Sequence, residues 1–174
     1  NKMDKTMINS PTQLHHRPFN TPLETGLRSL FLLSNVFPKF MDLQRLVYYD
    51  YLLVYSGDVT NGPPSLHPQI PLRGGGWLVR RQMVENGLSL MSSKELAQKK
   101  FDQTGILYGA TDLTEPFLKY LKSDYAQAIK SLSRWVTKTF TPYSDEALSS
   151  FMRENLGNWG AEFDRESVVR GYLT

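Results

Sequence analysis

The stretch LQRLVYYDYLLVYSG, residues 43–57, constrains the fold more than any other part of the chain. Drawn as a helix, it carries leucine and valine on one side and Tyr48, Tyr51 and Tyr55 on another. A helix that is apolar most of the way round is usually central in its domain. Asp42 stands directly before it and can cap its first turn. We therefore expect other helices to pack around residues 43–57.

One charge interrupts this apolar surface, because Asp50 falls inside the apolar face. A second buried charge is expected at Arg80, which falls inside the apolar arc of a later helix. A charge buried without a partner is strongly unfavourable, so each of the two needs one. We expect Asp50 and Arg80 to pair across the two helices. The alternative is a local distortion that takes one of them to solvent.

The remaining pattern is mostly helical. In TPLE, Thr21, Pro22 and Glu24 form a helix start with a capping box, and Leu23 is expected on the apolar face of the helix that follows. Another helix is expected over about 77–91, with Val79 in its apolar arc. The run LAQKKFDQTGILYGA predicts a hairpin that turns near Gly105. Further helices are expected after Thr114, over 125–140 and from Ser144.

This order predicts a mainly α fold: a winged helix-turn-helix-like domain with a β-hairpin wing and a C-terminal helical extension. We expect a loosely ordered arm over 1–18, the winged-helix-like core over 19–112, and the extension, packed on that core, over 113–174. The connection 57–76 holds five glycines and four prolines. It is longer than packing requires, and such loops are often functional or mobile. Its role stays open.

The helix over 77–91 offers candidate contacts for DNA or a partner protein. Arg81, Gln82 and Asn86 lie outside its apolar arc, and arginine, glutamine and asparagine read base edges in the major groove. Glu85 weakens this interpretation, because it repels phosphates. An ordinary solvated helix face is the alternative, and winged helices also dock proteins.

The wing and the connection before the helix add positive charge. Residues 73–100 contain six Lys or Arg against two Glu. Lys99 and Lys100 on the wing, together with Arg73, are expected to meet a phosphate backbone or an acidic partner. Lysines on an edge strand also prevent pairing with foreign strands, and the sequence leaves both interpretations open.

The three tyrosines of residues 43–57 have a separate interpretation. Tyr48, Tyr51 and Tyr55 could stack bases, but a stripe at helical spacing is more often core or subunit interface. We name them as a candidate protein interface.

Several kinds of chemistry find no support in the sequence. There is no cysteine, and LRGGGW lacks the Lys and Ser/Thr that a phosphate-binding loop requires. His15, His16 and His67 do not have the spacing of metal ligands. We therefore expect no enzyme, no cofactor and no metal. The net charge of +3 permits contact with nucleic acid without arguing for it. The longest apolar runs are about half of what a bilayer crossing needs, so we expect a cytoplasmic protein without a membrane partner.

Three long strings carry a family resemblance: FNTPLETGLRSLFLLSNVFPKFMDLQRLVYYDYLLVYSGD, GPPSLHPQIPLRGGGWLVRRQMVENGLSLM and FDQTGILYGAT. They resemble the middle component of bacterial three-component ABC-ATPase (ABC-3C) systems, the group to which the Lamassu anti-phage systems belong. The similarity covers roughly residues 19–138 and includes no catalytic signature. It implies a small non-catalytic subunit that works with an SMC/Rad50-like ATPase and an effector, often a nuclease.

We therefore predict an adaptor that links the DNA-sensing ATPase to the effector in anti-phage defence, with double-stranded DNA as a further partner within the complex. The alternative is a stand-alone winged-helix DNA-binding transcriptional regulator, which should dimerise and bind duplex DNA alone. The effector type, the activating signal and the stoichiometry are not encoded in any motif. The sequence also leaves open whether the basic face contacts DNA or protein.

Overall fold

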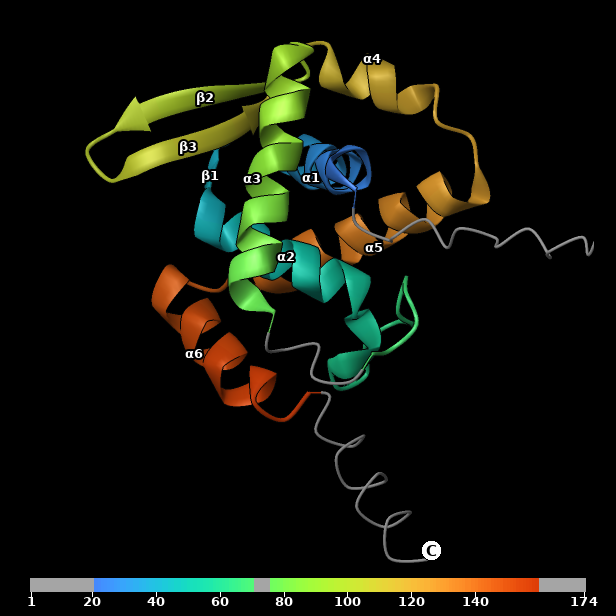
Figure 1. The fold of residues 1–174 in the computed structure, drawn as a ribbon, viewed down its shortest axis with the longest axis vertical. Helices are drawn as coiled ribbons and strands as arrows, with labels where there is room; N and C mark the ends of the chain where they lie inside the picture. Colours follow the sequence, from blue (N-terminus) through green and yellow to red (C-terminus); the bar gives the residue numbers. More distant parts are fainter. Residues whose placement is uncertain (1–20, 71–75, 160–174) are drawn as a thin grey trace, which may run out of the picture.

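The computed structural model describes residues 21–70 and 76–159 (Figure 1). The predicted arm over 1–18 lies outside the described residues. Within these two ranges the chain forms six α-helices, a short 3-10 helix and a three-stranded antiparallel sheet. The mainly α class expected from the sequence is therefore confirmed.

The first helix, α1 (Pro22–Val36), begins with the predicted capping box. The backbone N–H of Glu24 donates to the Thr21 hydroxyl, and the Thr21 N–H donates to the Glu24 carboxylate, each over 3.2 Å. The expectation that Leu23 belongs to the buried apolar face of α1 was wrong. Leu23 is 56% exposed, because it lies in the first turn on the side that faces solvent, whereas Arg28 is buried.

The second helix, α2 (Leu43–Val54), follows the two-residue strand β1 (Met41–Asp42) directly. The Asp42 carboxylate caps it by accepting from the Arg45 N–H over 2.9 Å. Every residue from Tyr49 to Val54 is buried. Helices α1, α3 and α5 all pack against α2. The predicted central position of this helix is therefore confirmed. The 3-10 helix η1 (Ser56–Asp58) ends the segment.

The third helix, α3 (Trp77–Ser93), crosses α1 at a point where two glycines meet. A Cβ atom added to Gly87 would lie 2.6 Å from the backbone nitrogen of Gly26. The two glycines thus let the helix backbones touch. The buried side of α3 is centred on Val84, Leu88 and Met91. Val79 lies away from that side and is 65% exposed, so its predicted place in the apolar arc was wrong.

The sheet consists of β1 and a hairpin formed by β2 (Ala97–Asp102) and β3 (Gly105–Ala110). The predicted turn is confirmed: Asp102 pairs with Gly105, whose φ of +125° suits glycine. The sequence pattern did not predict strand β1, whose Met41 pairs with Tyr108 of β3. The strand order β1-β3-β2 leaves β2 at the edge.

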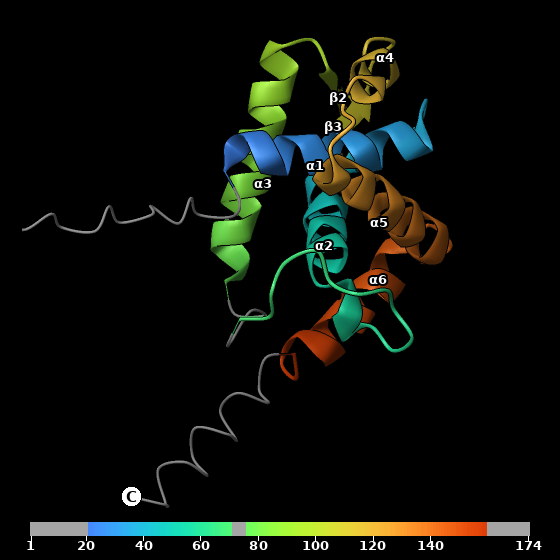
Figure 2. The ribbon, with the colours of Figure 1, turned by 90° about the vertical axis from the view of Figure 1, so that its right-hand side faces the viewer.

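Three more helices complete the described chain: α4 (Thr114–Lys119), α5 (Asp124–Phe140) and α6 (Asp145–Leu156). Side chains of α5 and α6 belong to the same hydrophobic cluster as those of α1, α2 and α3. Figure 2 shows α3 and α5 on opposite sides of α2, with α1 crossing above. The two helices therefore present two separate outer surfaces.

Candidate interaction surface

The solvent face of α3 carries few charges. Gln82 and Asn86 are exposed and hydrogen-bond each other, the Gln82 amide donating to Asn86 Oδ1 over 2.9 Å. Arg81 is half-buried and donates from Nη1 to Gln44 Oε1 on α2 over 3.2 Å. The charged residue left fully exposed on this helix is Glu85. From Gln82 to Asn86 the face is polar and slightly acidic, and Leu78 and Val79 are exposed in the first turn, which is unlike a base-reading helix.

The two hairpin lysines are both exposed but lie on opposite sides of the hairpin. Lys99 Nζ lies 5.7 Å from the centre of the Tyr108 ring, and Lys100 Nζ lies 5.7 Å from that of Phe40. Because successive strand residues face opposite ways, the two ammonium groups do not form a single patch.

An apolar pair lies further out on the hairpin. Phe101 and Ile106 are directly opposed across the strands and are 74% and 43% exposed. Strand alternation places them on the same side as Lys99 and Tyr108. Burial raises the pKa of the Tyr108 hydroxyl, and the charge of Glu85 on α3 acts in the same direction. Helix α3 contacts β2, the strand that carries Phe101.

A buried charge cluster joins the first three helices. Asp50 accepts from Arg28 Nε over 2.6 Å and from Arg80 Nη1 over 2.5 Å. The structure thus brings together Asp50 and Arg80, the pair expected from the sequence, and adds Arg28, which the sequence analysis missed. Burial raises the pKa of the Asp50 carboxyl, but the two guanidinium groups outweigh it and hold that pKa below its ordinary value.

The tyrosines named as a candidate protein interface lie mainly inside the protein. Tyr51 and Tyr55 are buried, and their rings lie 5.2 and 5.6 Å from the Arg80 guanidinium carbon. Their assignment to an interface was therefore wrong, because they surround a buried cation. Tyr48 is half-buried and packs on Trp77 at 4.9 Å between ring centres.

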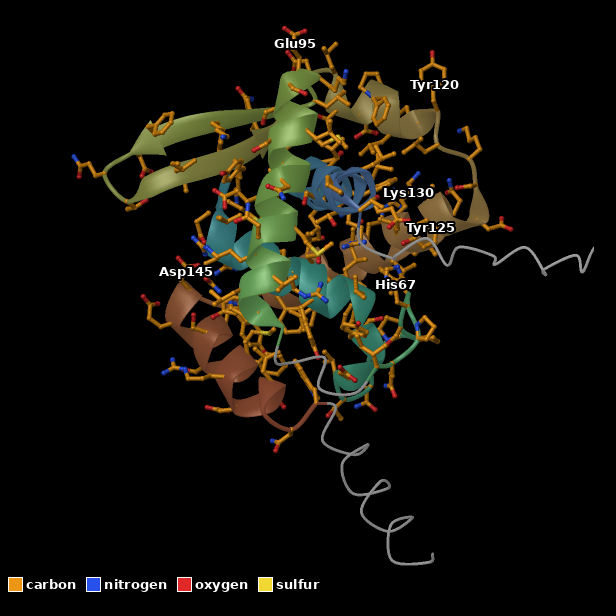
Figure 3. All side chains as sticks on the ribbon, in the orientation of Figure 1. His67, Glu95, Tyr120, Tyr125, Lys130 and Asp145 are labelled. Carbon is orange, nitrogen blue, oxygen red and sulfur yellow. The ribbon has the colours of Figure 1, made fainter. Side chains whose placement is uncertain are left out.

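A hollow of about 520 Å³ lies between the hairpin, α2 and the start of α6. Arg45 and Asp145 line it and form an ion pair of 2.6 Å (Figure 3 labels Asp145). Arg45 Nη2 also donates to the Tyr143 carbonyl over 2.8 Å. This arginine therefore ties α2 to the turn between α5 and α6.

Some expected features lie beyond what the structure describes. Arg73, His15 and His16 fall outside the described residues. In the ranges 21–70 and 76–159, no group of three or more His, Asp or Glu is placed to hold a metal ion. No helix of the described part combines the length and apolarity that crossing a bilayer requires.

Arg28 and the Phe101–Ile106 pair were not expected from the sequence. No local signal marks Arg28, which lies one turn from Thr25 on the side of α1 that the packed helices bury. The Phe101–Ile106 pair follows from the hairpin register once Gly105 is placed at the turn. None of these three residues belongs to a recognisable motif.

Comparison with known proteins gives one match. The family model of the ABC-three component (ABC-3C) system Middle Component 2 matches residues 18–162. No curated protein and no solved structure matches the chain. The matched range includes every helix and strand described above. This chain therefore belongs to the ABC-three component system Middle Component 2 family.

Proposed function

We propose that this chain is a non-catalytic adaptor of an ABC-3C anti-phage defence system of the Lamassu type. It binds the ABC ATPase, which is SMC/Rad50-like by the resemblance, and links it to an effector such as a nuclease. Membership in a family of middle components supports a role alongside other subunits. The proposal places the protein in the cytoplasm, where such a complex meets invading DNA.

The adaptor proposal treats residues 19–112 as a winged-helix-like module and 113–174 as an extension packed on it. The order α1, β1, α2, α3, β2, β3 with β3 between the other two strands supports this assignment. On this view the β2–β3 hairpin is the wing and α3 is the helix beside it.

The observation that carries the proposal is the exposed Phe101–Ile106 pair. An aromatic and a branched aliphatic side chain stand opposite each other near the end of a projecting hairpin. Exposed apolar side chains of this kind act as anchors when a partner protein covers them. They give no advantage in contact with a phosphate backbone, so we assign the wing to protein binding.

The neighbouring face of α3 supports the same assignment. Its exposed residues Gln82, Asn86 and Glu85 would supply a polar rim, and α3 contacts β2, the strand that carries Phe101. Protein interfaces commonly combine an apolar centre with such a rim. Lys99 stands at the edge of the pair and favours an acidic partner surface.

Co-purification tests the proposal directly. The tagged chain is expressed with the ATPase and effector encoded beside it, and the bound subunits are quantified. The double variant Phe101→Ser/Ile106→Ser should lose the ATPase, whereas Gln103→Ser, in the exposed turn of the same hairpin, should retain it. A wild-type chain that never co-purifies with the ATPase contradicts the adaptor role. Equal retention by the double variant contradicts the wing as its surface.

The second candidate is the stand-alone DNA-binding regulator. The observation that favours it is the exposure of Lys99 and Lys100 on a hairpin beside Gln82 and Asn86. A regulator should form a dimer and prefer one duplex sequence over others. Sedimentation of the isolated chain, together with selection from a random duplex pool, separates the two candidates. A monomer without sequence preference excludes the regulator.

A further inference from the structure

Helix α5 lies on the opposite side of α2 from α3 (Figure 2). A row of positively charged residues follows this helix. Lys130, Arg134 and Lys138 are spaced four residues apart, which brings them to one side of the helix. Arg134 and Lys138 are exposed, and Lys130 is half-buried. Figure 3 labels Lys130 on α5. No Asp or Glu occurs in the sequence between Asp124 and Asp145.

Lys39 extends this row beyond the helix. It lies with Lys138 on the wall of a hollow of about 640 Å³ between the ends of α1 and α5. Asn35 and Thr141 line the same hollow and add an amide and a hydroxyl. We call Lys39, Lys130, Arg134 and Lys138 the α5 cationic row.

None of the four side chains forms an ion pair with any residue of the described part of the chain. Arg28, Arg45, Arg80 and Lys119 pair with carboxylates, whereas other cations of the described ranges, among them Lys94, Lys99 and Lys100, form no ion pair there. Like charges spaced four residues apart repel each other and weaken a helix. Lys138, in the last turn, is favourable for the helix dipole, but Lys130 and Arg134 have no carboxylate partner in the described fold.

We propose that the α5 cationic row binds the phosphate backbone of duplex nucleic acid without reading its sequence. Lysine and arginine, with hydroxyl and amide donors among them, are the groups that commonly contact phosphates. Exposed Gln127, Ser131 and Thr141 supply such donors beside the row. From Lys130 to Lys138 the helix rises about 12 Å, which is several phosphates along one strand.

The composition of the row argues against other occupants. Phe37, which is 49% exposed, lines the hollow with Lys39 at one end of the row. Along α5 itself, between Gln127 and Lys138, no large apolar side chain is exposed, because Trp135 is half-buried. A protein partner would need apolar anchors there. A single strand would need aromatic rings on which bases could stack. A duplex backbone requires neither.

This inference goes beyond the adaptor role, because it assigns a second surface with a different ligand. The wing and α3 would hold a protein, while α5, on the other side of α2, would lie along DNA. It also differs from the DNA contacts expected from the sequence, which all lie between residues 73 and 100. The reason for the choice is what the cations contact: Arg80 and Arg81 are held by Asp50 and Gln44, whereas residues 125–144 hold three cations and no anion.

The test measures binding of the purified chain to a mixed-sequence duplex by fluorescence anisotropy over a range of salt concentrations. The variant Lys130→Gln/Arg134→Gln/Lys138→Gln should bind more weakly. The slope of log K against log salt should fall by about 3, one for each lost phosphate contact. Thermal melts of both proteins establish that the variant is folded.

The matched control is Lys94→Gln/Lys99→Gln/Lys100→Gln, which removes the same charge from the hairpin region. It should keep the affinity and salt slope of the wild type. Loss of binding in this control with retention in the α5 variant overturns the proposal, as does a wild type that binds no duplex at low salt. Polyglutamate is also added as a competitor at the same concentration of negative charge as unlabelled duplex. If it displaces the labelled duplex equally well, the proposal is overturned. Co-purification with the ATPase is scored separately, so failure of the adaptor role is distinguishable.

Discussion

Arg28 and Asp50 form an ion pair in the centre of the protein, with 2.6 Å between Nε and Oδ1 and at most 1% of either side chain exposed. A second contact runs from Arg28 Nη2 to Asp50 Oδ2 over 3.3 Å. Arg80 approaches the same carboxylate from α3. One acidic side chain therefore connects α1, α2 and α3, and the orientation of these helices depends on it.

The first prediction is that Asp50→Asn destabilises the protein severely. The substitution keeps the size of the side chain but leaves the buried Arg28 guanidinium and the half-buried Arg80 guanidinium without their anion. Breaking a buried pair in this way costs about 3–5 kcal/mol. Urea unfolding of the two proteins measures the loss.

Asp112→Asn is the matched control, because the same chemical change occurs at an exposed carboxylate. Its free energy of unfolding should stay within about 0.5 kcal/mol of the wild type. If Asp50→Asn were as stable as this control, the buried cluster would not hold the three helices together.

The second prediction concerns the crossing of α1 and α3. Gly87→Ala places a methyl group against the backbone of Gly26, which cannot move without shifting α1. We expect a loss of about 1–3 kcal/mol, which exceeds the helix propensity gained from alanine. Gly157→Ala serves as control, since a Cβ there meets nothing within 4 Å. A stabilised Gly87→Ala protein in thermal melts would show that the two backbones are not in contact.

Local signals in the sequence were enough to predict much of the fold. The capping box at Thr21 and Glu24, the cap at Asp42 and the turn at Gly105 each depend on neighbours within a few residues. The central position of α2 could be predicted because leucine, valine and tyrosine cover most of its surface. These features need no knowledge of tertiary contacts.

The errors concern contacts between distant segments. Val79 and Leu23 are apolar but exposed, because the buried side of each helix is set by the helices packed against it. Tyr51 and Tyr55 could not be assigned to the core without knowing that Arg80 lies against their rings. Arg28 was missed because a single arginine in an amphipathic helix gives no sign that a carboxylate 22 residues away will face it.

The third prediction compares the two partners of Arg45, the Tyr143 carbonyl and the Asp145 carboxylate. Arg45→Met removes the donor to the Tyr143 carbonyl and should cost about 1–3 kcal/mol, because a partly buried acceptor loses its hydrogen bond. Asp145→Asn should cost less than about 1 kcal/mol, since the Asp145 side chain is 70% exposed. Urea unfolding ranks the two variants. The reverse order would mean that the surface ion pair, and not the backbone contact, holds the turn.

The fourth prediction is a loss of stability on mild acidification that depends on His67. This side chain is 5% exposed, and its Nε2 lies 2.7 Å from the Tyr125 hydroxyl (Figure 3). Burial and the nearby charge of Arg28 hold the pKa of His67 below its ordinary value. The unfolded chain therefore takes up a proton at a higher pH than the folded chain. The contribution of neutral His67 to stability is present above the unfolded pKa of about 6.5 and is lost as the pH falls.

We expect the free energy of unfolding to decrease between about pH 7 and pH 5, by at most about 1.4 kcal/mol per pH unit from this one group. In His67→Gln the decrease should be smaller over the same range, although the variant is less stable at neutral pH because the contact with Tyr125 is altered. His15 and His16 are present in both proteins, so the difference between the two curves isolates His67. Parallel curves would mean that His67 titrates alike in the folded and unfolded chains, and that its burial does not suppress protonation.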